Sequence, residues 1–329
     1  MKPIFCLIIV LLFLSFAKSA SAEGNALVLS PSVIEINSQS PSEIYTPFSL
    51  ENKSSSPIEL TISYRPFKAA DSEDGKVSLL DEPYNDSFIY LKKHFDVLNE
   101  EKTPVTSLRI GPQQKETFQL RMRIPEGIDA QDSYFSLIFL PKQAEISEEA
   151  QVDKLTYSQI KAGIVMNVLL SITDDTKKPQ ATLQQFSTPF YQEKAPVPFT
   201  VRIHNSGIHR ITPKGVILIK NMFGQTVGRI NLDQANILSN STRAITNTQV
   251  AKEASSAAGL HVPTALWEEN LLLGWYTASL SLAMSEDGPI INREIYFFAF
   301  PITWIIGLIV VLIAVSIIII RVRKRLRQI

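Results

Sequence analysis

The densest group of possible metal ligands in the sequence is the acidic run Asp71-Ser72-Glu73-Asp74-Gly75. A calcium loop of the EF-hand type needs oxygen ligands at its first, third and fifth positions and a glycine at its sixth. Counted from Asp71, the glycine already occupies the fifth position, so the run does not match. A looser calcium site is the alternative, but a short polar run containing Asp-Gly is typical of a turn. We therefore expect a solvated hairpin turn.

The four histidines are the remaining candidates for metal binding. His204 and His209 flank the turn 205–207 and could meet across a hairpin. His94 and His261 lie elsewhere in the sequence, and two ligands without a nearby third make a poor zinc site. We predict turn or surface histidines, no metal and no other cofactor.

Motifs of nucleophilic or phosphoryl chemistry are absent from the sequence. It contains no Gly-x-Ser-x-Gly elbow, no Walker loop and no His-Glu-x-x-His. The single cysteine, Cys6, lies in a segment that we expect to be removed, so the mature protein has no disulfide and no thiol nucleophile. Carboxylate pairs such as Glu148-Glu149 are common on soluble surfaces. We predict that the protein is not an enzyme.

Two pairs of aromatic residues could contribute to binding. Phe190-Tyr191 lies between predicted strands, where exposed rings could stack on sugars or fill a pocket of a partner. The alternative, which we favour, is that this pair closes the hinge between two domains. Trp275 and Tyr276 fall in a predicted strand, and we expect both to pack in a core.

The elements that must position these residues are β-strands. Residues 58–64, 118–124 and 197–203 alternate between apolar and polar side chains, which places one face of each strand on a core. Residues 134–140 and 164–172 are apolar on both faces and are expected to be central strands.

Many short strands between turn residues predict an all-β chain of two immunoglobulin-like antiparallel β-sandwich domains, followed by one transmembrane helix. The first domain spans residues 23–175 and the second 180–300, with the polar segment 174–179 at the boundary. Each half opens with a strand that leads to an Asn-Lys or Asn-Ser turn, which indicates two related modules. Residues 250–270 could form a short helix or a long loop in the second domain.

Both ends of the chain are predicted to lie outside the sandwiches. Residues 1–22 read as a signal peptide, because Lys2 precedes 13 almost unbroken apolar residues and the cleavage pattern Ala20-Ser21-Ala22. Residues 302–320 carry no charge and, as a helix of 19 residues, would extend about 28 Å, enough to cross a bilayer. The basic tail 321–329 fixes the C-terminus in the cytoplasm and the N-terminus in an extracellular or periplasmic compartment.

The charge distribution excludes a nucleic-acid partner. The formal net charge is zero, but two lysines leave with the signal peptide and five cations lie in the tail, so the ectodomain carries −7. Nucleic-acid binding needs clustered lysine and arginine, which an acidic ectodomain does not offer.

The order of these features resembles bacterial WxL-interacting surface proteins. A strand ending in Asn52 is followed by a polar turn, a second strand and a hairpin with Ala70, Gly75 and Val77 at the matching positions. Segments 110–112, 118–125 and 134–139 are similar to the first domain of that family, and equally resemble the N-terminal immunoglobulin-like domain of periplasmic pilus chaperones. Segments that resemble the second domain of the WxL-interacting family are 224–227, 237–246 and 274–277. Residues 145–154 and 250–270 depart from both comparisons.

The resemblance implies a first domain that engages peptidoglycan and a second that engages a partner protein. We therefore expect a membrane-anchored cell-surface binding protein for cell-wall peptidoglycan, an exported surface protein, or both, with the lipid bilayer contacted through the C-terminal helix. The alternative is a membrane-tethered, chaperone-like assembly factor for surface or pilus subunits. No binding residue of the family can be assigned to a position in this sequence.

Overall fold

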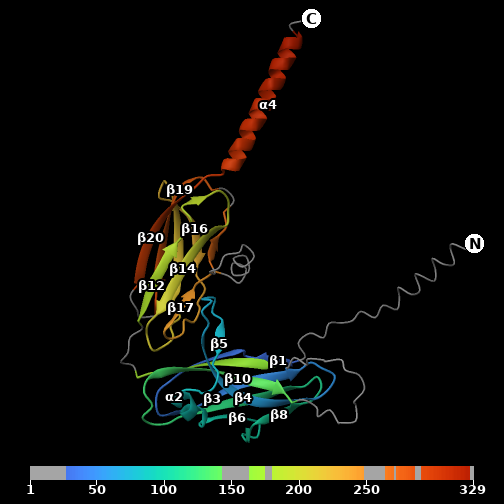
Figure 1. The fold of residues 1–329 in the computed structure, drawn as a ribbon, viewed down its shortest axis with the longest axis vertical. Helices are drawn as coiled ribbons and strands as arrows, with labels where there is room; N and C mark the ends of the chain where they lie inside the picture. Colours follow the sequence, from blue (N-terminus) through green and yellow to red (C-terminus); the bar gives the residue numbers. More distant parts are fainter. Residues whose placement is uncertain are drawn as a thin grey trace, which may run out of the picture.

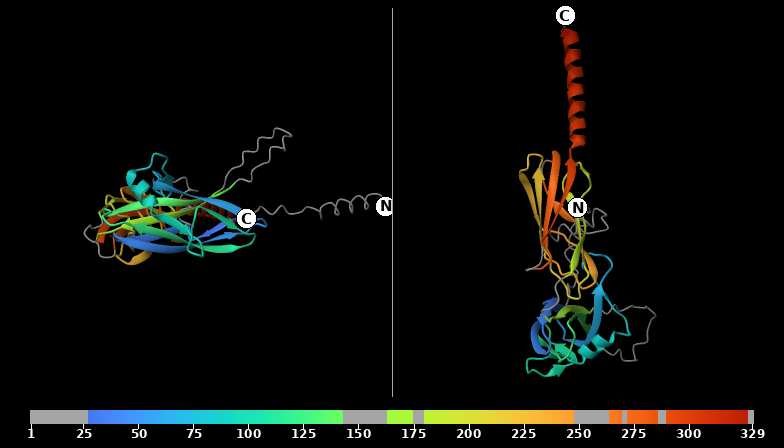
Figure 2. Two further views of the ribbon diagram at one scale, coloured as in Figure 1. Left: turned by 90° about the horizontal axis from the view of Figure 1, so that it is seen from below. Right: turned by 90° about the vertical axis from the view of Figure 1, so that its left-hand side faces the viewer.

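The computed structural model describes residues 27–142, 163–174, 180–247, 264–269, 272–285 and 290–326. Figure 1 and the right-hand view of Figure 2 show two β-rich domains and a long C-terminal helix, α4, which leaves the second domain at the end away from the first. The predicted signal peptide, the boundary residues 175–179 and most of segment 250–270 lie outside the described residues. The prediction of a mostly β chain is confirmed.

The first domain is a sandwich of two sheets. One sheet has the strand order β1-β3-β9-β6-β7, and the other has β2-β11-β10-β4-β5 with β8 also paired to β4. The strands are β1 (Leu27–Ser30), β2 (Val33–Ser38), β3 (Ser42–Asn52), β4 (Ile58–Ala69), β5 (Val77–Leu79), β6 (Phe95–Leu98), β7 (Pro104–Val105), β8 (Ser107–Ile110), β9 (Lys115–Ile124), β10 (Gln131–Pro141) and β11 (Ile164–Ile172).

The core of the first domain lies between these sheets, as the alternating sequence predicts. Leu120 of β9 is fully buried, and Phe48 of β3 lies with its ring centre 5.6 Å from that of Phe139 in β10 on the opposite sheet. The two strands that are apolar on both faces, β10 and β11, are neighbours in the middle of their sheet, which confirms their predicted position.

The second domain repeats this plan. Its sheets have the orders β12-β14-β17, with β18 also paired to β14, and β13-β20-β19-β15-β16. Ring centres of Phe199 and Phe297 lie 5.9 Å apart across the core, and Val201 is fully buried. The strands are β12 (Ala181–Ser187), β13 (Tyr191–Gln192), β14 (Val197–Asn205), β15 (Lys214–Asn221), β16 (Thr226–Asn231), β17 (Ser241–Ala244), β18 (Ala265–Trp267), β19 (Gly274–Ala283) and β20 (Ile290–Ala299).

Two strand pairs depart from the predicted antiparallel arrangement. β2 runs parallel to β11, and β13 runs parallel to β20. The reason is the same in both domains: the first strand divides, so that its first part (β1 or β12) joins one sheet and its second part (β2 or β13) joins the other. A further departure is the short helix α2 (Asp86–Lys92), which begins after Asn85, whose side chain accepts a hydrogen bond from the Phe88 amide.

A buried asparagine occupies the same place in both domains. Asn52 ends β3 and Asn205 ends β14, and both are completely buried. The side-chain nitrogen of each lies within 3.2 Å of three backbone carbonyls, those of Ser56, Ile110 and Gly111 for Asn52 and those of His209, Ile237 and Leu238 for Asn205. Each side-chain oxygen accepts a hydrogen bond from the amide two residues later, at 2.9 Å. Each domain therefore has a buried asparagine that links neighbouring loops through hydrogen bonds, and this arrangement is called the asparagine joint below.

The C-terminal helix α4 spans Ile302–Leu326. It continues past the predicted end at residue 320 into the basic tail, because arginine and lysine favour helices and their charge is favourable near a helix C-terminus. Within the described residues, no helix was found that is long and apolar enough to cross a membrane.

Candidate binding cleft between the domains

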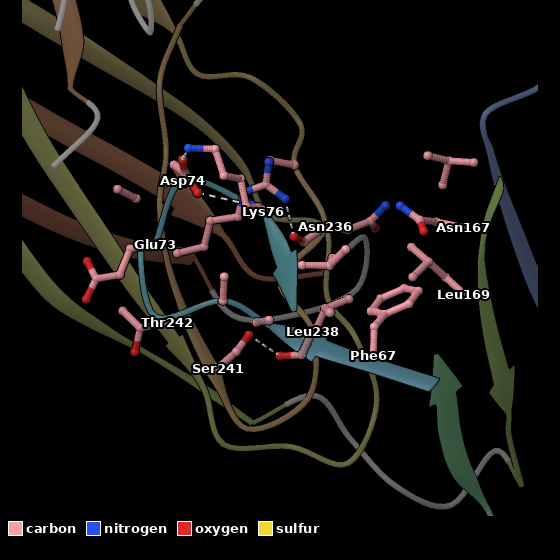
Figure 3. A pocket seen from close by; sticks show the side chains of 18 of the residues that line it. Phe67, Glu73, Asp74, Lys76, Asn167, Leu169, Asn236, Leu238, Ser241 and Thr242 are labelled. Carbon is pink, nitrogen blue, oxygen red and sulfur yellow. Dashed lines mark hydrogen bonds and ion pairs between the residues drawn. The ribbon is translucent and has the colours of Figure 1, made fainter. Parts of the chain in front are cut away.

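A cleft of about 640 Å³ lies where the two domains meet (Figure 3). The first domain contributes outward-facing residues of β2, β4 and β11 and the hairpin between β4 and β5. The second domain contributes the loop between β16 and β17, and β17 itself. Asn167 and Asn236 point toward one another from the two sides.

The acidic run forms the turn of the β4–β5 hairpin. The Ala70 amide donates to the Lys76 carbonyl at 2.9 Å, and the Asp74 carboxylate lies 2.7 Å from the Lys76 ammonium. Burial alone would raise the pKa of Asp74, but hydrogen bonds from Lys76 and Ser72 and the Lys76 charge hold this pKa well below its usual range.

The predicted hairpin turn is confirmed, and Asp71, Ser72 and Gly75 are exposed as expected. The prediction is wrong for Glu73 and Asp74, which are half-buried because the turn also binds the second domain. The Glu73 carboxylate accepts hydrogen bonds from both Nε (2.7 Å) and Nη2 of Arg202 in β14. The Glu73 carbonyl also accepts from the Ala244 amide at 2.9 Å. Glu73 adopts a φ of 54°, in the left-handed region that a glutamate rarely occupies. The local sequence does not favour that conformation, so the contacts to the second domain hold it.

Arg243 of β17 packs against the same turn from the cleft side. A Cβ at Gly75 (φ 84°) would collide with the Arg243 guanidinium, so this position needs glycine both for its backbone and for space. Arg243 Nη1 donates to the Asn236 carbonyl at 2.6 Å. Burial lowers the pKa of Arg243, against the effect of the Asp74 charge, but an arginine remains protonated in proteins.

A second group of interdomain bonds lies on the other side of the cleft. The fully buried Asp132 carboxylate contacts His209 Nδ1 at 2.8 Å and accepts from the Arg210 amide at 2.5 Å. Tyr134 donates to Asp132 and accepts from the Ser239 amide at 3.0 Å. Burial and the Asp132 charge raise the pKa of Tyr134, which keeps the phenol protonated as a donor.

Apolar side chains fill the space between these polar groups. Phe67 of β4 and Leu169 of β11 form a buried cluster with Leu238 of the second domain, and Phe67 stacks on Tyr134 with ring centres 6.0 Å apart. Tyr134 and Leu169 lie on the outer faces of β10 and β11, so this cluster covers part of the second apolar face of these strands. Contacts on two sides and an apolar centre hold the domains together around the cleft.

Two strands at the cleft have a neighbour on one side only. In the described part of the chain, β2 and β17 each stand at the end of their sheet, next to β11 and β14 respectively. Such an edge presents backbone N–H and C=O groups that can pair with a further strand. On β17, the hairpin occupies this edge at Ala244 through the Glu73 carbonyl.

The two histidines that flank the turn 205–207 bind different partners. His204 Nδ1 lies 3.0 Å from the Thr242 hydroxyl and His209 binds Asp132, so the pair is engaged by separate partners. Across the described residues, no three His, Cys, Asp or Glu side chains gather as a metal site would need.

The aromatic predictions are largely wrong. Tyr276 is buried as expected, but Trp275, its neighbour on the same strand, must point to the opposite face and is 50% exposed. Phe190 and Tyr191 do not close the hinge. The preceding strand β12 spans 7 residues and carries the chain roughly 23 Å away from the boundary, where Tyr191 pairs with Phe298 of β20.

Comparisons with known proteins assign no family to this chain. No known family and no curated protein matches the sequence. Among solved structures, it is similar to a chain of a chaperone–tip adhesin complex of CFA/I fimbriae biogenesis (TM-score 0.37, 10% identity, 82% of this chain and 98% of that chain covered). It is also similar to the class 5 fimbriae chaperone CfaA (TM-score 0.35, 10% identity, 84% and 99% covered).

A third similar structure is a chain of the CsuC–CsuE chaperone–tip adhesion subunit pre-assembly complex of Acinetobacter baumannii (TM-score 0.34, 10% identity, 81% and 97% covered). These neighbours are pilus-chaperone-like. The resemblance of this chain to WxL-interacting proteins stays a prediction. At TM-scores of 0.37 and below, the similarities assign neither a partner nor a function.

Proposed function

We propose that this protein is an exported binding protein, without catalytic activity, that holds an extended segment of another exported protein in its interdomain cleft. In this proposal α4 anchors the protein to a membrane, with both sandwiches outside the cytoplasm and the basic C-terminus inside. The anchor rests on the sequence: 19 uncharged residues followed by five cations.

The observation that carries the binding proposal is the one-sided strand β2 at the cleft, together with the part of the β17 edge around Thr242 that the hairpin leaves unoccupied. An extended segment can add to such an edge through its backbone, while pockets for alternate side chains supply specificity. The cleft offers exposed apolar contacts at Val33 and Val77, which are 43% and 36% exposed, and a protonated donor at Arg243. This mixture suits a peptide, whose successive side chains point in opposite directions.

The cleft favours a protein segment over peptidoglycan, the other predicted partner. Sugars are commonly bound by stacking on exposed aromatic rings. Phe67 is the one aromatic residue in the described lining, and it is buried against Tyr134. Peptidoglycan is therefore the comparison arm of the binding test.

The binding test uses two matched valines. Val33 lines the cleft and is 43% exposed, whereas Val227 is 39% exposed on β16 outside the lining. A photo-crosslinking residue at Thr242 of the membrane-embedded full chain should capture exported proteins. Val33→Trp, which places a bulky ring in the cleft beside the β2 edge, should abolish capture. Val227→Trp should leave it unchanged. Capture that survives Val33→Trp, or binding to purified peptidoglycan that Val33→Trp removes instead, would contradict the proposal.

The same crosslink separates the two predicted roles. A partner that remains attached after it reaches the surface indicates a cell-surface binding protein. A partner that is captured during export and released when it assembles indicates the membrane-tethered, chaperone-like assembly factor.

The anchor has a separate test. The full chain should stay in the membrane pellet in alkaline carbonate, and protease added outside should digest the sandwiches and spare an epitope on the basic tail. Extraction by carbonate would show that α4 is not an anchor.

A further inference from the structure

An exposed aromatic cluster lies at the end of the second domain where α4 begins. Phe190 is 65% exposed, Trp275 50% and Tyr191 44%, and the half-buried Phe298 and Phe300 complete the group. Soluble surfaces rarely display contiguous apolar areas of this kind without a binding role.

The rings form one connected surface. Trp275 packs edge-on against Phe190 with ring centres 5.7 Å apart, and its ring is tilted against Phe298 with ring centres 5.2 Å apart. Phe298 in turn lies 6.4 Å from Tyr191 and 6.1 Å from Phe300. Because these residues come from β13, β19 and β20 and from the segments that flank them, the sandwich itself holds the cluster in place.

Further apolar side chains extend the surface around the same end of the domain. Met222, Phe223 and Leu273 are 53%, 80% and 52% exposed. The strand register places the β15–β16 turn beside the start of β19, since Asn221 pairs with Tyr276. The aromatic cluster and these three residues together are called the basal surface below.

The basal surface is fixed directly to the start of α4. Tyr191 donates its hydroxyl hydrogen to the Phe300 carbonyl at 2.7 Å, and the Phe300 amide donates to the Gln192 carbonyl at 2.9 Å. The Glu193 carboxylate accepts from the Thr303 amide at 3.2 Å, within the first turn of the helix. Only Pro301 separates Phe300 from α4, so a membrane that contains α4 would meet the basal surface at once.

We propose that the basal surface docks into the headgroup region of the bilayer. This inference rests on the proposed membrane anchor. Tryptophan and tyrosine favour the headgroup level, where the ring is shielded and its polar atom stays hydrated. Continuity with α4 selects lipid as the occupant over a second copy of the chain or a partner protein. Docking would fix the tilt of the ectodomain, and with it the direction in which the cleft opens.

The three tryptophans of the chain provide the test. Trp275 is in the basal surface, Trp267 is buried in the core, and Trp304 lies in the proposed anchor. Three variants of the full chain, each keeping one tryptophan and carrying phenylalanine at the other two positions, are reconstituted into phosphatidylcholine vesicles. Lipids brominated near the headgroup or near the tail end of the acyl chain then quench only residues at their own depth.

We expect the Trp275 variant to lose about half of its emission to the lipid brominated near the headgroup and little to the other, as a residue at the interface should. The variant that keeps only Trp267 should lose little emission to either lipid. Quenching of Trp304 without quenching of Trp275 would overturn the docking surface and leave the anchor intact. Absence of quenching at Trp304 would overturn both proposals.

Two surface variants and a dilution series complete the test. Phe223→Ser in the Trp275 variant should reduce the quenching, whereas Tyr45→Ser, at a residue 48% exposed on the first domain, should not. Nanodiscs that hold one copy each should give the same quenching as vesicles. If Trp275 is shielded only when several copies share a vesicle, a second copy covers the surface and the lipid proposal is wrong.

Discussion

Removing the Glu73–Arg202 bond should weaken the junction between the domains by a measurable amount. The side chain of Glu73 is 19% exposed and that of Arg202 is 31% exposed, so the pair lies between the surface and buried limits. Exposed ion pairs contribute about 0.2–1 kcal/mol, and hydrogen bonds to charged groups in folded proteins about 1.5–3 kcal/mol. With two hydrogen bonds in partial shelter, we expect a coupling free energy of about 1.5 kcal/mol.

A double-mutant cycle isolates this quantity. The free energy of unfolding in urea is measured for the wild type, Glu73→Ala, Arg202→Ala and the double variant, and the difference from additivity gives the coupling. Alanine and glutamate have a similar free-energy cost in the left-handed conformation, so Glu73→Ala changes the side-chain contacts and leaves the backbone cost of φ 54° nearly the same. Arg65 and Asp81, a pair within the first domain whose aspartate is 92% exposed, form the control, with an expected coupling below about 0.5 kcal/mol. Equal coupling free energies for the two pairs would refute the conclusion that the Glu73–Arg202 bond stabilises the junction between the domains.

Three further outcomes are expected. Asn205→Ala should cost about 3 kcal/mol because it removes four hydrogen bonds to backbone groups of neighbouring loops, whereas the exposed Asn231→Ala should change thermal stability by less than about 0.5 kcal/mol. Similar losses would contradict the structural role of Asn205. The pKa of Asp74 is lower in the folded state than in the unfolded state, so the Asp74 carboxylate stabilises the fold fully above about pH 4, its unfolded pKa, and this stabilisation is lost as the pH falls further. The melting temperature of Asp74→Asn should therefore fall less steeply than that of the wild type below about pH 4. Leu120→Asp should unfold the first domain at a cost of several kcal/mol, while Gln119→Ser on the opposite face of β9 should leave its circular dichroism melt nearly unchanged.

Strand patterning made the fold predictable. An alternation such as Phe118, Leu120 and Met122 reports which face of β9 is buried, and this depends on the strand alone. The same local rule could not place Trp275, because Trp275 and Tyr276 both favour strands and only pairing with neighbours decides which of them faces inward.

The cleft was not predictable from the sequence, because it depends on contacts between distant segments. Glu73 and Arg202 are 129 residues apart, and Asn236 reaches Glu35 across 201. Neither pair differs in sequence from the polar and charged residues of an ordinary solvated face. A faint signal did exist in β10 and β11, because Tyr134 and Leu169 on their second apolar face are covered by Leu238 of the other domain.

The asparagine joints bear on how the protein reaches its folded state. Sandwich domains of exported proteins often depend on an oxidant to staple their sheets with a disulfide. Here no cysteine follows residue 6, and Asn52 and Asn205 instead tie their loops by hydrogen bonds that form as the strands come together. Maturation of this chain therefore needs no thiol oxidase and no disulfide shuffling. Its folding should proceed at the same rate in reducing and oxidising buffers, so the proposed export would place no redox requirement on folding.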